Sequence, residues 1–303
     1  MTELTVFQQK LSTVFTDLDV RFNEPMSKHT SFRIGGGAEA MVFPKNREEL
    51  AFVLKTSALL DVKPAILGAG TNVLAPDAGI SGLVICLKDC LDGMELLEGN
   101  RIRVMAGVTM TRAAMFAANR NLGGMEFAHG IPGTVGGGVY MNAGAYGGEI
   151  CQICECVEVM DLAGTITVKS CEQMQFSYRH SVLEEEGGIV ISATFRLEPK
   201  PGEEVKANMK ELQAKRSTSQ PLDLPSAGSA FKRPVGGYAA ALIDQAGMKG
   251  YQVGGAAIST KHAGFAVNLG GATAEDVKNL LKQVSDKVFE NSGIRIEPEI
   301  RIW

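Results

Sequence analysis

Short apolar runs alternate with helical patterns over the first ninety residues of the chain. Phe7, Leu11 and Phe15 have helical spacing and predict a helix at the start of the chain. Residues 38–44 (AEAMVFP) predict a strand, and residues 46–61 after it predict a helix, with Asn46 as a suitable N-cap. Two further strands are predicted where the apolar runs KPAILGAG and SGLVICL occur.

Strand patterns dominate the next hundred residues, and the character of the chain then changes. One helix, TRAAMFAANRNL, interrupts five strand-like runs between residues 94 and 197. The sequence EPKPG at residues 198–202 reads as a hinge. Beyond it we predict three helices, EEVKANMKELQAKRSTS, GYAAALIDQAG and TAEDVKNLLKQVSDKVFENSG, and two strands, AGFAVNLG and IRIEPEIRIW. The pattern predicts an α+β protein of at least two domains with a boundary near residue 198.

Composition and charge exclude several classes of protein. The chain of 303 residues is 45% hydrophobic and 21% charged, as ordinary globular proteins are. A net charge of −4 and a pI near 5.7 argue against general nucleic-acid binding, which needs a basic surface. No run of eighteen apolar residues is present, so we expect no membrane span. The N-terminus lacks the pattern of a signal peptide, which predicts a cytoplasmic protein.

Six cysteines are present, and three of them cluster at Cys151, Cys154 and Cys156. A zinc site would need a second pair of cysteines, or histidines at ligand spacing, and neither follows. The cluster instead alternates with apolar residues, as a strand does. We therefore expect reduced thiols and no bound metal.

Three glycine-containing segments are candidates for holding a phosphate group. They are residues 35–37, residues 66–79 (ILGAGTNVLAPDAG) and residues 130–149, which contain eight glycines among twenty residues. None of them fits the Walker A motif or the dinucleotide fingerprint. Each could be a simple turn. A glycine inside regular structure costs about 0.5–1 kcal/mol relative to alanine, so eight in one segment suggest a backbone pressed against a flat or phosphorylated ligand.

A series of motifs in a fixed order gives a resemblance to a known family. In chain order they are KHTSFRIGG, GAGTNVLAPDAGISGLVI, GIPGTVGGGVYMNAGAYGGE, FSYRHS, QPLDLPSAGSAFKRP, LIDQAGMKG, STKHAGFAVN and IEPEI. Together they resemble the UDP-N-acetylenolpyruvoylglucosamine reductase family, from about residue 23 to residue 302. The short connection between YRHS and the hinge resembles the shorter subtype of that family. One departure is Gly264, where family members usually have asparagine.

The resemblance implies a fold and a reaction. It implies a p-cresol methylhydroxylase-type FAD-binding region at residues 1–198, with α+β subdomains at about 20–87 and 88–198. A C-terminal α+β substrate-binding domain would occupy residues 199–303, with its last strand near 294–303 returning toward the active site. It also implies FAD and NADPH, and reduction of UDP-N-acetylglucosamine enolpyruvate to UDP-N-acetylmuramate, a precursor of peptidoglycan.

The same resemblance assigns three catalytic residues. Ser229 matches the family's proton donor, which must protonate the carbon next to the one that receives hydride. Arg179 matches an arginine that can bind the enolpyruvyl carboxylate and stabilise charge that develops there. Glu299 matches the family's C-terminal glutamate, which we expect to act in protonated form or through a partner, and Glu297 is its rival.

Binding residues follow from the motifs and from charge. The resemblance places the FAD pyrophosphate against Gly68, Ala69, Gly70, Thr71 and Asn72. It places the isoalloxazine against Ile131, Pro132, Gly133, Thr134 and Gly138. The UDP diphosphate suits basic residues of the last third of the chain, namely Lys215, Arg216, Lys232, Lys249 and Lys261. Each of these alone could be an ordinary solvated side chain.

Two other functions stay open at this point. Another oxidoreductase on the same flavin fold would keep the glycine segments but would not need Ser229, Arg179 and Glu299 in these contexts. A non-catalytic protein that binds a nucleotide sugar could use the glycine segments for ligand binding alone. His129 and His262 are more often structural than catalytic, and we expect no role for them.

Overall fold

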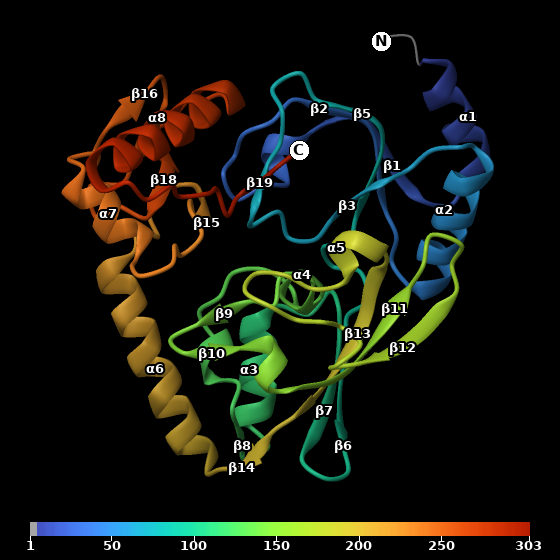
Figure 1. Cartoon of the computed structure of the whole chain (residues 1–303). Helices are drawn as coiled ribbons and strands as arrows, with labels where there is room; N and C mark the ends of the chain where they lie inside the picture. Colours follow the sequence, from blue (N-terminus) through green and yellow to red (C-terminus); the bar gives the residue numbers. More distant parts are fainter. Residues whose placement is uncertain (1–4) are drawn as a thin grey trace. The chain divides into compact units, whose positions relative to one another are not determined.

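The computed structural model describes residues 5–303, and helices and strands alternate along that range (Figure 1). The chain forms two compact units, each made of three segments. The first contains the described residues up to Arg21 together with Ala40–Ala69 and Gly82–Arg216, and the second contains Phe22–Glu39, Gly70–Ser81 and Ser217–Trp303. These units are interleaved along the chain, whereas the predicted domains 1–198 and 199–303 are consecutive. The boundary near residue 198 stays a prediction.

The N-terminal part of the chain contributes one sheet and two helices. The sheet has the strand order β1-β2-β5-β3, and its β3 and β5 run parallel. The elements are α1 (Val6–Val14), β1 (Asp19–Pro25), β2 (Gly37–Phe43), α2 (Arg47–Leu59), β3 (Ala65–Leu67) and β5 (Ile80–Cys86). The side chain of Asn46 accepts a hydrogen bond from the Glu49 amide at 2.8 Å, so the predicted N-cap is confirmed.

A second, antiparallel sheet lies in the first unit, with strand order β12-β11-β13-β7-β6. Its central strand β13 is buried along nearly its whole length, as its apolar sequence predicts. The remaining elements of this part are β6 (Met94–Leu97), β7 (Arg101–Met105), α3 (Met110–Ala118), β8 (Leu122–Gly123), α4 (Val135–Tyr140), β9 (Gly144–Ala145), β10 (Gly148–Glu149), β11 (Cys154–Met160), β12 (Ile166–Ser170), α5 (Leu183–Glu186), β13 (Ile189–Arg196), β14 (Glu198–Pro199) and α6 (Gly202–Ser219).

The glycine-rich segment 130–149 contains a helix that the sequence did not predict. Val135–Tyr140 forms α4, whose N-cap is Thr134, and residues 144–149 form the hairpin of β9 and β10. A Cβ atom at Gly136 would lie 2.9 Å from the Ala106 Cβ, and one at Gly138 would lie 2.8 Å from the Met110 Sδ. The protein's own packing therefore favours glycine at position 136 even without a ligand, whereas the contact at Gly138 is with the flexible end of the Met110 side chain.

Adjacent glycines of α4 give a matched test of this packing. Gly136→Ala should lower the free energy of unfolding by about 1–3 kcal/mol, because its methyl group would overlap Ala106. Gly137→Ala should leave it unchanged or raise it by about 0.5–1 kcal/mol, because the nearest atom is 3.8 Å away and alanine favours helix. Denaturant unfolding of the two variants measures the difference. Equal effects would contradict the packing explanation.

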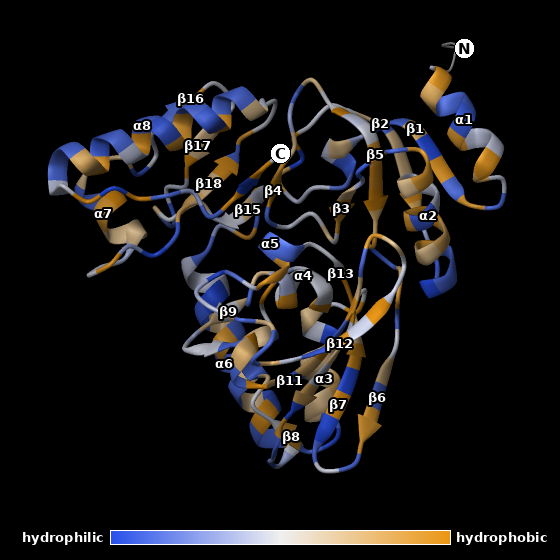
Figure 2. Cartoon of the chain, turned by 45° about the vertical axis from the view of Figure 1, so that its right-hand side comes forward, coloured by the Kyte–Doolittle hydropathy of each residue, from blue (hydrophilic) through white to orange (hydrophobic). Residues whose placement is uncertain are grey.

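The second unit is built around a sheet with strand order β15-β18-β17-β16, against which α8 packs (Figure 1). Its elements are β4 (Val73–Leu74), β15 (Ser226–Ser229), α7 (Ala239–Gln245), β16 (Gln252–Val253), β17 (Ala256–Ile258), β18 (Phe265–Asn268), α8 (Ala274–Ser292) and β19 (Arg301–Ile302). Figure 2 shows polar and apolar residues mixed along α8. Its buried side chains Val277, Leu280, Val284 and Val288 form one face, as the sequence pattern predicts.

Both ends of α8 are capped. Thr273 and Asp276 form a capping box at the N-terminus, and Gly293 ends the helix in the left-handed conformation with φ 70°. The carboxylate of Asp77 also accepts hydrogen bonds from the amides of Ala274 at 2.7 Å and Glu275 at 3.1 Å. Residues 70–81 are thereby tied to the C-terminal part of the second unit.

The prediction of a continuous strand over residues 294–303 is wrong. Only Arg301–Ile302 forms a strand, which pairs in parallel with β4, and Pro298 makes a single bridge to Phe231. Proline lacks the amide that a regular ladder needs, so the segment cannot pair continuously.

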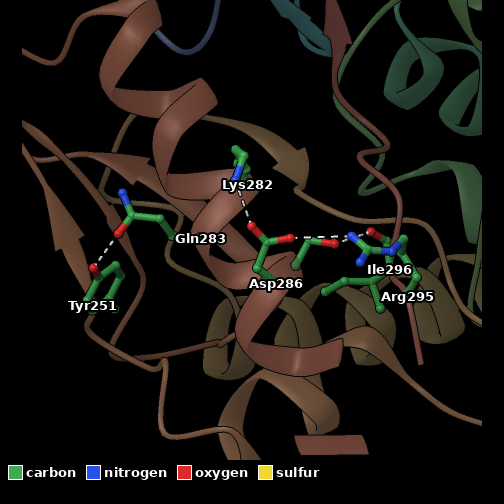
Figure 3. Close-up of polar contacts among 7 residues, drawn as sticks. Tyr251, Lys282, Gln283, Asp286, Arg295 and Ile296 are labelled. Atoms are coloured by element: carbon green, nitrogen blue, oxygen red, sulfur yellow. Dashed lines mark hydrogen bonds and ion pairs between the residues drawn. The ribbon is translucent and has the colours of Figure 1, made fainter. Parts of the chain in front are cut away.

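The segment before that strand is held to α8 by polar contacts (Figure 3). The Ser285 hydroxyl donates to the Ile296 carbonyl at 2.8 Å, and Arg295 lies 3.3 Å from the Asp286 carboxylate. Lys282 also pairs with Asp286, and both cations lower the pKa of that carboxyl group. These contacts hold residues 295 and 296 against α8, a few residues before Glu299 in the chain.

A further polar contact joins α8 to the loop before β16. On the far side of the same helix, Tyr251 donates to Gln283.

Candidate functional site

Arg179 lies at the tip of a tight turn in the first unit. The main chains of Ser177 and His180 exchange two hydrogen bonds of 3.2 Å, which leaves Tyr178 and Arg179 as the turn residues. Arg179 has φ 56°, in the left-handed region that favours glycine. Its guanidinium donates to the Gly144 carbonyl at 3.0 Å and lies 5.0 Å from the centre of the Tyr178 ring. A non-glycine residue in this conformation is held there by its surroundings.

The predicted FAD-binding segments of the first unit lie at the end of β3 and at the start of α4. Gly68 and Ala69 follow the carboxyl end of β3, beside the parallel strand β5, where ligands commonly bind in sheets of this kind. A Cβ atom at Gly68 would lie 3.4 Å from the Thr134 hydroxyl, so this loop approaches the N-cap of α4. Gly133 has φ 113°, which only glycine adopts readily. These small residues allow the close main-chain approach that FAD needs.

Ser229 and Glu299 are neighbours in the second unit. Ser229 ends β15 and is exposed, and the main chain of the next residue, Ala230, is held on both sides. The Ala230 carbonyl accepts from the Glu299 amide at 2.9 Å, and the Ala230 amide donates to the Gly264 carbonyl at 2.8 Å. Two residues predicted to be catalytic, 70 positions apart in the sequence, are thus both joined to Ala230, Ser229 through the chain and Glu299 through a hydrogen bond.

Asn72 extends this group of residues. Its side-chain amide donates to the Glu299 carbonyl at 3.2 Å, and its own carbonyl accepts from the Arg301 amide at 3.0 Å. Gly70, two residues earlier, has φ 63°, and a Cβ atom there would lie 2.0 Å from the His29 carbonyl oxygen. Asn72, the last residue of the predicted pyrophosphate loop, is therefore fixed against the segment that carries Glu299.

Gly264 is buried, and its carbonyl accepts the hydrogen bond from the Ala230 amide. Its amide donates to His262 Nδ1 at 3.1 Å, and a Cβ atom would lie 3.0 Å from the His262 ring and 3.2 Å from the Ala240 Cβ. Burial lowers the pKa of His262, which keeps the ring neutral as an acceptor. Glycine at this position is explained by local packing, and His262 has a structural contact, as its sequence context predicts.

Each of the five basic residues predicted for the diphosphate has a neighbour within the protein. Lys215 pairs with Glu211 at 2.6 Å, Lys232 with Glu297 at 3.5 Å, and Lys249 with Asp244 at 3.9 Å. Exposed pairs of this kind contribute about 0–1 kcal/mol, so a phosphate could displace the carboxylates at small cost. Their role in substrate binding stays a prediction.

Lys261 and Arg216 have more specific positions. Lys261 Nζ donates to the Ser217 carbonyl at 2.7 Å, in the last turn of α6, where a cation is favourable. Arg216 packs beside Gly130, where a Cβ atom would lie 3.0 Å from the Arg216 Cδ. Burial lowers the pKa of Arg216 while Tyr146 raises it, so α6 ends close to the tip of the β9–β10 hairpin.

The cysteines are free thiols, and Cys154 lies in β11 as its alternating pattern predicts. Within residues 5–303, no group of three or more His, Cys, Asp or Glu side chains is placed to hold a metal ion. Burial and a hydrogen bond with Glu149 raise the pKa of Cys151 to about 11. Over that same part of the chain, no helix is both long and apolar enough to cross a membrane.

Alkylation should report the raised pKa of Cys151. Because the thiolate is the nucleophile, its fraction and the alkylation rate should rise about tenfold per pH unit between pH 7 and pH 10. At pH 7.5 iodoacetamide should react with Cys151 far more slowly than with free cysteine, as mass spectrometry of the modified peptide can measure. A rate at pH 7.5 equal to that of free cysteine would contradict the burial of this thiol.

Asn142 and Ser181 contact the Arg179 turn, and sequence reasoning missed both. Asn142 is 1% exposed and donates to the Ser177 carbonyl at 2.9 Å, while Ser181 is fully buried and donates to the Tyr140 carbonyl at 2.8 Å. A polar residue among glycines and buried apolar residues was the available signal for Asn142. No comparable signal marked Ser181.

Two models of known protein families match parts of this chain. Residues 38–169 match the family model described as FAD binding domain. Residues 220–303 match the model described as UDP-N-acetylenolpyruvoylglucosamine reductase, C-terminal domain. The chain is therefore a flavoprotein of the FAD-binding class with a separate C-terminal domain.

Relatives over the whole length identify the family. The UDP-N-acetylenolpyruvoylglucosamine reductases of Streptococcus pneumoniae strains Hungary19A-6 and 70585 are each 42% identical over 295 residues, or 97% of this chain and of the relative. The crystal structure of the corresponding reductase (MurB) from Thermus caldophilus is 35% identical, with a TM-score of 0.77 over 94% of this chain and 98% of that one. This chain belongs to the UDP-N-acetylenolpyruvoylglucosamine reductase family.

The family membership settles two of the predictions made above. The α+β fold class, with an FAD-binding region followed by a C-terminal domain, is confirmed. The resemblance inferred from the ordered motifs is confirmed as well. The roles of Arg179, Ser229 and Glu299 and of the binding residues stay predictions.

Proposed function

We propose that this chain is an FAD-dependent oxidoreductase that uses NADPH to reduce UDP-N-acetylglucosamine enolpyruvate to UDP-N-acetylmuramate, for peptidoglycan synthesis. The observation that carries the proposal is the pairing of the Ser229 and Glu299 segments around Ala230, with Asn72 bonded to the Glu299 carbonyl. A nucleotide-binding protein without catalysis would not need the segments that carry Ser229 and Glu299 to be bonded to each other. The relatives that cover the whole chain carry the same activity in their names.

FAD would be held by main chain rather than by long side chains. Gly68, Ala69 and Gly70 would face the pyrophosphate, and Ile131–Thr134 with Gly138 would face the isoalloxazine. When bound, FAD would supply the hydride for the enolpyruvyl double bond, with NADPH as the reductant. The protein must exclude water from this transfer, bind the carboxylate and deliver one proton.

Ser229 is the residue that we propose to deliver the proton. Hydrogen bonds hold the Ala230 peptide on both sides, so the Ser229 side chain starts from a fixed main chain. A hydroxyl is a weak acid, but the carbanion that forms next to a carboxylate is a strong base. Positioning the hydroxyl beside that carbon is therefore the main requirement.

Arg179 is proposed to bind the carboxylate of the enolpyruvyl group. A guanidinium has five N–H donors, which is enough to bind a carboxylate in bidentate fashion in addition to the Gly144 carbonyl. Negative charge spreads onto the carboxylate as hydride arrives, so the guanidinium stabilises the transition state more than the ground state.

Glu299 is proposed to act beside Ser229, protonated or through a partner, so that no negative charge opposes the carbanion. Its amide and carbonyl are fixed by Ala230 and Asn72, which sets the position of its side chain. Lys215, Arg216, Lys232, Lys249 and Lys261 are proposed to serve the UDP end of the substrate. A cytoplasmic location is part of the same proposal.

A coupled assay tests the reaction. The purified protein should be yellow, and it should oxidise NADPH rapidly only when the enolpyruvyl UDP-sugar is added, with one product formed for each NADPH. A flavin-containing protein that fails this assay would overturn the proposed reaction and favour another oxidoreductase on the same fold. A colourless protein that takes up no FAD but binds the UDP-sugar would favour a non-catalytic role.

A further inference from the structure

Three alternate residues of the glycine-rich segment hold the turn that carries Arg179. We infer that Asn142 and Ser181 are positioning residues that set the direction of the Arg179 guanidinium during reduction of the enolpyruvyl group. The inference rests on the proposed function, because it assigns these residues to the same substrate carboxylate.

Asn142 fixes the beginning of the turn. Its Nδ2 donates to the Ser177 carbonyl at 2.9 Å and lies 3.2 Å from the Glu149 carboxylate, while its Oδ1 accepts from the Cys151 amide at 2.9 Å. The residue is 1% exposed and has φ 42°, a conformation that asparagine tolerates better than most residues. One side chain thus joins the turn, the β9–β10 hairpin and the short 3-10 helix Ile150–Gln152 that follows the hairpin.

Ser181 fixes the end of the turn. Its hydroxyl is fully buried and donates to the Tyr140 carbonyl at 2.8 Å, at the last residue of α4. A buried hydroxyl group needs a hydrogen-bond acceptor, and the Tyr140 carbonyl serves as one for Ser181. The bond ties the main chain two residues after Arg179 to the helix that contains the three consecutive glycines.

Arg179 itself makes the third contact, from its guanidinium to the Gly144 carbonyl. Tyr140, Asn142 and Gly144 therefore contact Ser181, Ser177 and Arg179, respectively. This arrangement holds the left-handed conformation of Arg179, which costs about 1–2 kcal/mol for an L-residue. A small displacement of the Arg179 guanidinium would reduce catalysis strongly, so we expect loss of these contacts to lower turnover as well as stability.

Ser181→Ala is the most direct test, because alanine fills nearly the same space. We expect kcat for the enolpyruvyl UDP-sugar to fall about tenfold, as expected for loss of one buried hydrogen bond behind a charged group. Reduction of FAD by NADPH should be unchanged. The affinity for UDP-N-acetylglucosamine, which lacks the enolpyruvyl carboxylate, should also be unchanged.

A double-mutant cycle separates positioning from simple structural support. If Ser181 acts through Arg179, adding Ser181→Ala to Arg179→Ala should cause no further loss of kcat. Ser57→Ala is the matched control, because Ser57 is 1% exposed and donates to the Val53 carbonyl at 2.7 Å in α2. It should leave kcat unchanged in both backgrounds.

Asn142→Asp provides an independent variant, because it keeps the acceptor for Cys151 but cannot donate to Ser177. It should lower kcat without lowering the rate of FAD reduction by NADPH, and this loss should also disappear in the Arg179→Ala background. Additive effects of Ser181→Ala and Arg179→Ala would overturn the inference while leaving the proposed function intact. Absence of turnover in the unmodified protein would instead reject the proposed function.

Discussion

Ser229→Ala is expected to lower turnover of the enolpyruvyl UDP-sugar by about 10²–10⁴-fold, the usual contribution of a positioned general acid. Reduction of bound FAD by NADPH should continue at nearly the normal rate, because that step needs no proton from Ser229. The fold should survive, since Ser229 is exposed at the end of β15 and the Ala230 contacts involve only the main chain. Rapid mixing can follow the flavin absorbance through each half-reaction separately.

The neighbouring Ser226 supplies the control for this experiment. It lies three residues earlier in the same strand, and its carbonyl accepts from the Ser31 hydroxyl at 2.6 Å. Because that contact uses the main chain, Ser226→Ala should leave both half-reactions within about twofold of normal. If Ser229→Ala slowed both half-reactions equally, Ser229 would be a structural residue and the proton would have another source.

Arg179→Gly is expected to lower the rate of turnover while leaving the free energy of unfolding nearly unchanged. Turnover should fall by about 10²–10³-fold, as when a donor to a developing negative charge is removed. The free energy of unfolding should stay within about 1 kcal/mol of normal. Glycine relieves the left-handed strain at φ 56°, and this gain offsets the lost bond to Gly144.

Arg179→Ala is the paired variant. It should lose turnover to the same extent, but it should also lower the free energy of unfolding by about 1 kcal/mol, because alanine keeps the strain and loses the contact. Denaturant unfolding and steady-state kinetics of the two variants measure both effects. Retained turnover in the glycine variant would show that Arg179 does not stabilise the reaction. A glycine variant less stable than the alanine variant would contradict the strain argument.

The glycine-rich segment 130–149 shows where sequence reasoning was incomplete. The density of glycine correctly marked a segment in which main chain approaches other groups closely. It did not reveal that Gly136 approaches Ala106, or that Gly148 lies against Phe127, where a Cβ atom would be 2.5 Å from the ring. Glycine is required both where another part of the protein lies close to the main chain and where a ligand does. The sequence therefore does not distinguish these two causes.

Local patterns were sufficient for most of the elements. The helix from Arg47 begins at the predicted cap Asn46, and α8 ends at Gly293, because capping depends on residues that are adjacent in the sequence. For residues 294–303, local patterns gave a wrong prediction. Its alternating apolar residues suggested a strand, but pairing depends on partners distant in the chain and on the missing amide of Pro298.

The sequence by itself determined the family, the α+β class and the identity of the residues proposed for catalysis, because these depend on ordered motifs and local patterns. Only the tertiary structure decided that Glu299 lies beside Ser229 and that Asn72 bonds to Glu299. It alone revealed that Asn142 and Ser181 hold the Arg179 turn. Each of these contacts joins residues at least 35 positions apart, and local propensities carry no information about which distant segments will pack together.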